Sequence, residues 1–283
     1  MREIGLAHLS LLQLDPPDLV TTAARAGYDF VGIRVRGATP AEDIPDQAAG
    51  SAASRSTVAR LSDTGLRVRD IEFLSLDGRT GREAWLPMLE AGAAYGADII
   101  NVAGRDADRA RLTETLAELV RDAADHGIVP ALEAISYNAV ATVADAAAVA
   151  TAAGARVMLD PLHLVRGGSS VADVAALEAR LIPVLQLCDG PAAVPSDLDV
   201  PTPLPRGMTA DGEPRKVESR ALRRAPGEGA FPLRELLRAV RKDTPLSLEV
   251  PDHARAARLG ALGWAEHLLT STRELLATVD EPA

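Results

Sequence analysis

Residues 123–133 read AADHGIVPALE and contain the pattern that decides the fold. A glycine just past a helical segment can take the left-handed conformation that ends the helix. The short apolar run that follows Gly127 is typical of a strand buried on both faces. The same junction of helix, glycine and strand recurs at four further glycines, spaced about thirty residues apart as in one strand-helix unit: Gly27, Gly65, Gly96 and Gly154.

Eight short apolar runs are candidate strands, and Ala- and Leu-rich segments such as Val140–Ala153 between them are predicted helices. The candidate strands are Ile4–His8, Phe30–Arg34, Val68–Phe73, Asp98–Val102, Val129–Glu133, Val157–Asp160, Val184–Leu187 and Leu246–Glu249. This pattern predicts an α/β fold, a single (β/α)8 TIM barrel domain over residues 1–283. A doubly wound open sheet is the alternative, but no G-x-G-x-x-G follows the first strand, where a dinucleotide site would need it.

The composition fits one barrel and excludes several classes of protein. The chain has 283 residues, of which 47% are hydrophobic, so disorder and small disulfide scaffolds are excluded. A net charge of −10 and an aromatic content of 3% argue against a nucleic-acid partner. Cys188 is the lone cysteine, residues 1–10 do not form a basic segment followed by a long apolar run, and no stretch approaches the ~20 apolar residues of a membrane span. We therefore expect a soluble cytoplasmic protein with no membrane partner.

One segment, Asp189–Pro232, breaks the periodic pattern with prolines, glycines and charges. It follows the seventh predicted strand, on the face of a barrel where active sites lie. Loops of this length inside a compact domain are usually functional or disordered. We expect a long loop between the seventh strand and the seventh helix that covers the substrate, with a tolerated surface insertion as the alternative.

Polar side chains stand in or at the end of four consecutive predicted strands, the fifth to the eighth: Glu133, Asp160, Gln186 and Glu249. In a barrel they would meet at the carboxyl rim, where three carboxylates repel one another unless a cation offsets them. Oxygen ligands are typical of a harder ion such as Mn²⁺ or Mg²⁺, whereas a structural zinc site typically has thiolate ligands. The alternative is that these residues cap helices or form turns, as Asp160 before Pro161 would. If Gln186 only satisfies backbone groups, Asp189 could ligate in its place.

Further polar residues at the same rim are candidates for substrate contact. A histidine near a metal-binding aspartate, such as His163, can bind substrate or move protons. Arginine suits a substrate hydroxyl, carboxylate or phosphate. The alternatives are that the histidines are hydrogen-bonded core residues, that Glu72 is a solvated acid, and that Arg220 and Arg223 lie in a solvated basic loop. The predicted substrate-binding residues are His8, Glu72, Arg166, Arg220 and Arg223.

These motifs resemble the xylose isomerase-like TIM barrels, the sugar phosphate isomerase/epimerase group of the AP endonuclease 2-like superfamily. The group also contains endonuclease IV-type enzymes, tagatose epimerases, inosose dehydratases and some dehydroshikimate dehydratases. The resemblance covers essentially the whole chain. It rests on Gly5–Leu9, Ala24–Asp29, Asp160–His163, Pro183–Asp189, Pro226–Gly229 and Leu248–Val250.

The resemblance implies a divalent metal, Mn²⁺ first and Mg²⁺, Co²⁺ or Zn²⁺ as alternatives, held by Glu133, Asp160, Gln186 and Glu249. It implies that Glu133 and Glu249 also exchange protons and that His163 completes the catalytic set, with arginines orienting the substrate. The third ligand is usually histidine in the epimerases of the group, so Gln186 is a departure. Endonuclease activity needs several more histidines than the five present.

A metal that polarises a carbonyl would stabilise the enediolate formed when the neighbouring proton is removed. The expected function is therefore a metal-dependent isomerase or epimerase of a keto-sugar or related polyol. The alternative is a lyase or dehydratase acting on a keto-cyclitol, a dehydroshikimate-like acid or a 3-keto-glycoside. A non-catalytic sugar-binding barrel is the second alternative. The expected partners are a small sugar-like molecule and, through exposed barrel helices, further copies of the chain.

Overall fold

The computed structural model describes residues 2–196, 198–200, 202–210 and 212–279. Its eight strands pair in parallel in the order β6-β5-β4-β3-β2-β1-β8-β7. Leu159, just past β6, forms a parallel bridge with Leu185 of β7, and its carbonyl accepts the Gln186 N–H at 2.8 Å. This contact closes the barrel and confirms the predicted (β/α)8 fold. The strands are β1 (Ile4–Leu6), β2 (Phe30–Arg34), β3 (Arg67–Leu76), β4 (Ile99–Gly104), β5 (Val129–Glu133), β6 (Arg156–Met158), β7 (Leu185–Leu187) and β8 (Leu246–Leu248).

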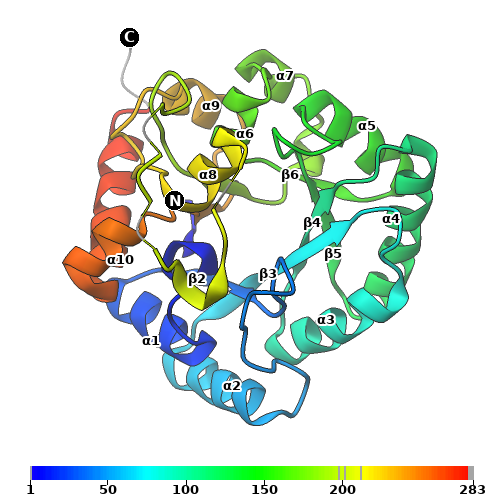
Figure 1. Ribbon diagram of the computed structural model, residues 1–283, viewed down its shortest axis with the longest axis horizontal. Coiled ribbons are helices and arrows are strands. Elements are labelled where there is room, and N and C mark those ends of the chain that lie inside the picture. The colour runs from blue at the N-terminus through cyan, green and yellow to red at the C-terminus, as the bar shows by residue number, and fades with distance from the viewer. Residues whose placement is uncertain (1, 197, 201, 211, 280–283) are drawn as a thin grey trace.

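Helices surround the strands as an outer ring (Figure 1). All five predicted junction glycines lie just past a helix and have positive φ. Gly27 (φ 90°) ends its helix by donating its N–H to the carbonyls of Ala23 and Ala24, in a conformation that side chains disfavour. The helices are α1 (Pro16–Ala26), α2 (Ala52–Thr64), α3 (Arg82–Tyr95), α4 (Arg109–Ala124), α5 (Val143–Ala153), α6 (Pro161–Arg166), α7 (Val171–Ala175), α8 (Pro214–Ala221), α9 (Leu233–Ala239) and α10 (His253–Ala277), with 3₁₀ turns η1 (His8–Leu11), η2 (Ala179–Leu181) and η3 (Pro205–Gly207).

Two strand ends differ from the sequence-based boundaries in a way that positions the site. The prediction ends the first strand on His8, but β1 stops at Leu6 and His8 opens the buried turn η1. The sixth strand stops at Met158, and Asp160 instead caps α6 by accepting the Leu162 N–H at 2.7 Å. The local hydrogen bonds of Asp160 to the first turn of α6 favour a helix start over a longer sixth strand.

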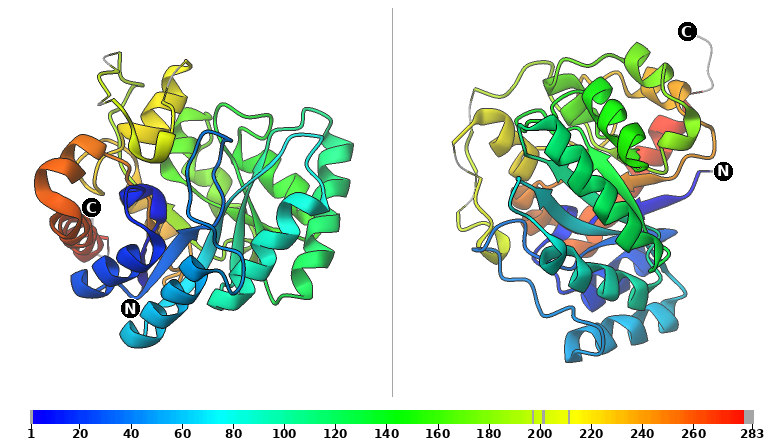
Figure 2. Two further views of the ribbon diagram at one scale, coloured as in Figure 1. Left: turned by 60° about the horizontal axis from the view of Figure 1, so that its bottom comes forward. Right: turned by 90° about the vertical axis from the view of Figure 1, so that its right-hand side faces the viewer.

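The segment that follows β7 is not one continuous loop, because η3 and α8 lie within it. It covers one end of the barrel, where its yellow part lies above the ring of helices (Figure 2). Val217, Ser219 and Ala221 of α8 are buried against the barrel, so this part of the segment packs as an amphipathic helix. In the described parts of the chain, no helix combines the length and hydropathy that crossing a membrane requires.

Candidate active site at the carboxyl end of the barrel

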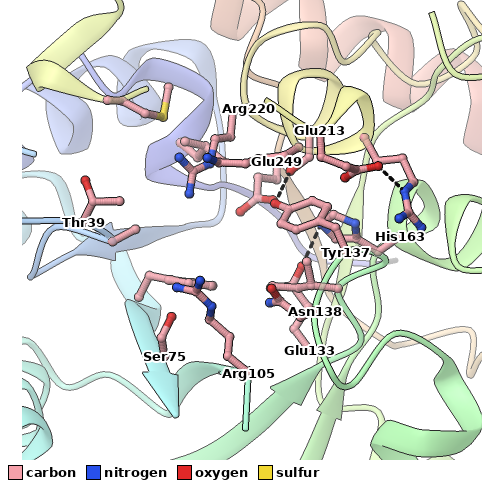
Figure 3. Close-up of a pocket in the computed structure, with 18 of the residues that line it drawn as sticks. Thr39, Ser75, Arg105, Glu133, Tyr137, Asn138, His163, Glu213, Arg220 and Glu249 are labelled. Carbon is pink, nitrogen blue, oxygen red and sulfur yellow. Dashed lines mark hydrogen bonds and ion pairs between the residues drawn. The ribbon is translucent and has the colours of Figure 1, made fainter. Parts of the chain in front are cut away.

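A cavity of about 380 Å³ opens at the carboxyl ends of the strands, between the barrel and α8. Its wall combines residues far apart in the sequence, as expected for a barrel active site. Figure 3 shows Glu133, Tyr137, His163 and Glu249 around this cavity. Three of these four residues were predicted from the sequence, and Tyr137 was not.

Glu133, Asp160 and His163 form a buried group whose potential ligand atoms all lie within 4.8 Å of one another. Glu133 ends β5, and His163 Nε2 lies 3.7 Å from Glu133 Oε1. Asp160 Oδ1 accepts the backbone N–H groups of Leu162 and His163, so the first turn of α6 fixes the aspartate beside the histidine. The structure thus contains a possible Glu/Asp/His metal site.

Gln186 and Glu249 come from the next two strands and contact each other. The Gln186 amide nitrogen donates to Glu249 Oε1 at 2.8 Å, and Gln186 Oε1 is buried without a partner among the described residues. Asn101 of β4 donates to Glu133 Oε2 at 3.0 Å, and its own Oδ1 is also buried and unpartnered in that part of the chain. The sequence signal for Asn101 was a single polar residue within the apolar run of residues 99–103.

Arg223 links the two halves of the cluster. Its Nη1 lies 2.5 Å from Asp160 Oδ2, its Nη2 lies 2.9 Å from Glu249 Oε2, and only 1% of its side chain is exposed. Its Nε donates to the Ser219 carbonyl at 2.8 Å. The next residue, Arg224, forms an antiparallel bridge with Asp189 just past β7. This bridge fixes the main chain next to Arg223, so the guanidinium lies beside the cluster.

The pKa values in the cluster follow from burial and from this uneven distribution of charge. Burial, together with the charges of Glu249 and Asp160, raises the pKa of Glu133 well above its usual value. Burial also raises the pKa of Glu249, to about 8, against the opposing effect of Arg223. For Asp160 the burial effect is outweighed by Arg223 and His163, and its pKa is lowered.

Among the described residues, Arg223 is the only arginine or lysine that pairs with any of the three carboxylates Glu133, Asp160 and Glu249 of the cluster, so negative charge exceeds positive charge there. Three carboxylates, an imidazole and unpartnered amide oxygens form a donor set that suits a divalent cation. The residues present fit the metal that the resemblance implies.

Two other predicted substrate-binding residues, His8 and Glu72, are buried and are not among the residues that line the cavity. Arg34 Nε lies 3.4 Å from Glu72 Oε1, and Arg34 Nη1 lies 3.1 Å from Glu42 Oε2, with all three side chains buried. Burial, only partly offset by Arg34, raises the pKa of Glu72. His8 bonds to backbone groups on both ring nitrogens, with Leu14 O at 3.0 Å and the Arg34 N–H at 3.0 Å.

Arg166 of α6 contacts the segment that follows β7, and Arg220 belongs to that segment. Arg166 forms a two-pronged ion pair with buried Glu218 at 2.7 and 2.6 Å and stacks over Phe231 at 5.1 Å. These contacts join α6 to α8 and hold the covering segment against the barrel. Arg220 lines the cavity itself and donates to the Thr209 carbonyl at 2.7 Å.

We expect acid to destabilise the protein partly through His8. Burial lowers the pKa of His8 to about 4, whereas an unfolded histidine titrates near 6.5. Its contribution to stability is fully present above pH 6.5 and is lost as the pH falls toward 4, by about 2 kcal/mol between pH 7 and pH 5. Urea unfolding at these two pH values measures the loss, and His8→Asn serves as the control without a titrating group. Equal losses in the two proteins would contradict the prediction.

The closed eight-stranded parallel barrel, with a polar cavity at its carboxyl end, is a TIM barrel of the kind that carries an active site. The chain belongs to the xylose isomerase-like TIM barrel family, whose model matches residues 20–275. This confirms the resemblance that the sequence motifs indicated. No curated protein sequence matches the chain.

Several solved structures share the fold. A xylose isomerase-like TIM barrel/4-hydroxyphenylpyruvate dioxygenase fusion protein has a TM-score of 0.76 at 20% identity over 98% of this chain, which spans only 43% of the fusion protein. A zinc-bound IolI protein has a TM-score of 0.68 at 14% identity, covering 98% of this chain and 97% of that one. The probable 3-DHS dehydratase AsbF from Bacillus anthracis has a TM-score of 0.70 at 16% identity, covering 95% and 99%.

A 3-keto-D-glucoside 4-epimerase, YcjR from E. coli, has a TM-score of 0.64 at 16% identity, covering 99% of both chains. The neighbours thus include an epimerase, a dehydratase and a protein that binds zinc. At these identities the likeness establishes the fold.

Proposed function

We propose that this chain is a divalent-metal-dependent isomerase or epimerase that removes a proton next to the carbonyl of a keto-sugar or related polyol. The observation that carries the proposal is the pair of buried carboxylates, Glu133 and Glu249, that border one cavity and have raised pKa values. The presence of an epimerase among the structural neighbours supports the proposal by analogy of fold.

Glu133, Asp160, Gln186 and Glu249 would hold the cation, with His163 as a further donor beside them. When bound, a divalent cation supplies Lewis-acid polarisation of a carbonyl oxygen. We propose Mn²⁺ because the donor set is dominated by oxygen. The pKa directions suit proton exchange, since a carboxylate whose pKa approaches the working pH can both accept a proton and return it.

A lyase is the second candidate, and Tyr137 favours it. Its hydroxyl lies 3.0 Å from Ser219 Oγ, its ring packs edge-on against His163 at 5.5 Å, and burial raises its pKa, so it stays protonated. Loss of a β-hydroxyl needs a proton for the leaving oxygen, which an uncharged phenol in the cavity can donate. The dehydratase among the structural neighbours supports this candidate in the same way.

The first test is the metal content of the purified protein before and after reconstitution with Mn²⁺, Mg²⁺, Co²⁺ or Zn²⁺. We expect about one metal per chain and its loss in Glu133→Gln, because that change removes a charged ligand from the buried group. Glu213→Gln is the matched control, since Glu213 lines the same cavity but pairs with Arg215. A protein that binds no metal, or a Glu133→Gln variant that keeps it, would overturn the proposal.

Incubation of the metal-loaded protein with keto-sugars and keto-cyclitols in D₂O then separates the two candidates. Deuterium in a rearranged substrate that keeps all its oxygens supports the isomerase or epimerase. Loss of water from the product supports the lyase.

A further inference from the structure

The cavity carries more positive charge than the proposed chemistry uses. Six basic side chains line it in a protein whose net charge is −10: Arg34, Arg105, Arg215, Lys216, Arg220 and Arg223. Four of them interact with other groups of the protein. Arg34 and Arg223 pair with buried carboxylates, Arg215 pairs with Glu213 at 2.5 Å, and Lys216 also has a partner.

Arg105 and Arg220 differ from the other four. In the described ranges of the chain, the Arg105 guanidinium makes no hydrogen bond or ion pair, and Arg220 donates only to the Thr209 carbonyl and pairs with no carboxylate. Figure 3 shows both side chains bordering the same open space, with Ser75 beside Arg105. The two guanidinium groups carry ten N–H donors, of which only the one bonded to the Thr209 carbonyl has a partner in the described ranges.

The main chain of Arg105 is fixed at the rim of the barrel, and its side chain is exposed. Arg105 directly follows β4, and its N–H donates to the carbonyl of Leu76, the last residue of β3, at 2.8 Å. In the ladder between β4 and β5, Ala103 pairs with Glu133, so Arg105 lies two residues beyond the level of Glu133. Two residues of strand rise about 7 Å, which places Arg105 farther out along the cavity than the acid cluster.

We propose that Arg105 and Arg220 form an anion-binding subsite that takes a carboxylate or phosphate group of the substrate. The subsite holds this group several ångströms from the carbon that reacts at the acid cluster, an assignment that rests on the proposed function. Planar guanidinium groups bind both oxyanions through paired hydrogen bonds. A neutral polyol would leave both cations without a counter-ion, whereas an anionic substrate needs them to approach a protein of net negative charge.

The test measures binding to the metal-loaded protein by calorimetry with three probes that share one ring. The probes are cyclohexanecarboxylate, cyclohexyl phosphate and the neutral cyclohexylmethanol. We expect at least one anionic probe to bind tenfold or more tightly than the neutral probe. Preference for the carboxylate or for the phosphate identifies which oxyanion the substrate carries.

Variants then assign the binding to the two arginines. Arg105→Gln and Arg220→Gln should each weaken the preferred anion at least tenfold, whereas Arg215→Gln, which removes a paired cation from the same cavity, should change it less than twofold. Equal binding of charged and neutral probes would overturn the proposal, as would equal weakening by all three variants, which would indicate only a general positive field. Metal content and probe binding are separate readouts, so failure of the proposed function and failure of the subsite are distinguishable.

Discussion

Glu249→Gln is expected to reduce kcat by about 10²- to 10⁴-fold, the contribution typical of a general acid-base group, while the barrel stays folded. Glu249 accepts hydrogen bonds from Gln186 Nε2 at 2.8 Å and Arg223 Nη2 at 2.9 Å. A glutamine has nearly the same shape and keeps an oxygen that can accept one of these bonds. What it lacks is the charge and the ability to take up a proton.

The fold should tolerate this change because the site already disfavours the charge. Burial raises the pKa of Glu249 to about 8, so the site disfavours the ionised carboxylate, and a neutral glutamine removes a charge whose burial is costly. Steady-state kinetics on the substrate found by deuterium exchange, with metal analysis and thermal melting alongside, measures the effect. Glu213→Gln is the control in the same cavity. Full activity of Glu249→Gln would contradict the assigned role.

Local sequence signals could predict the barrel because each signal acts within a few residues. The glycine that ends a helix and the apolar run after it are adjacent in the chain, so Gly127 and β5 follow from one short stretch. The convergence of Glu133, Asp160, Gln186 and Glu249 follows from topology, since parallel strands bring their carboxyl ends to one rim.

Other parts of the site depend on tertiary contacts that no local pattern encodes. Arg223 reaches Asp160 only because the chain returns to the barrel after more than thirty residues and bridges Asp189 through Arg224. The sequence offered Arg223 as one of several loop cations and gave no means to separate it from Arg220, which bonds to the Thr209 carbonyl instead. The sequence did not single out Asn101 either, because its hydrogen bond to Glu133 joins residues of two strands that lie 32 positions apart in the chain.

Arg223→Met is expected to destabilise the metal-free protein by about 3–5 kcal/mol, because it removes one partner of a buried ion pair and leaves the other uncompensated. The Arg223 guanidinium lies 2.5 Å from Asp160 and 2.9 Å from Glu249. Without it, these two carboxylates and Glu133 would repel one another with no cation between them. Urea unfolding in the presence of a chelator measures the loss. Arg224→Met is the matched control, since the neighbouring Arg224 is exposed and a surface change costs within about 0.5 kcal/mol.

The same variant also tests how the guanidinium and the proposed metal share these carboxylates. Both are cations next to Asp160 and Glu249, so a bound divalent metal should compensate part of the charge that Arg223→Met exposes. We therefore expect Arg223→Met to lose less unfolding free energy in saturating Mn²⁺ than in chelator. Arg223→Lys keeps the charge but loses the bidentate geometry, so its stability should lie between those of Arg223→Met and the wild type. A loss no larger than that of Arg224→Met would contradict the role of Arg223 as counter-ion. A loss that is equal with and without metal would mean that the metal, if bound, is held by other groups.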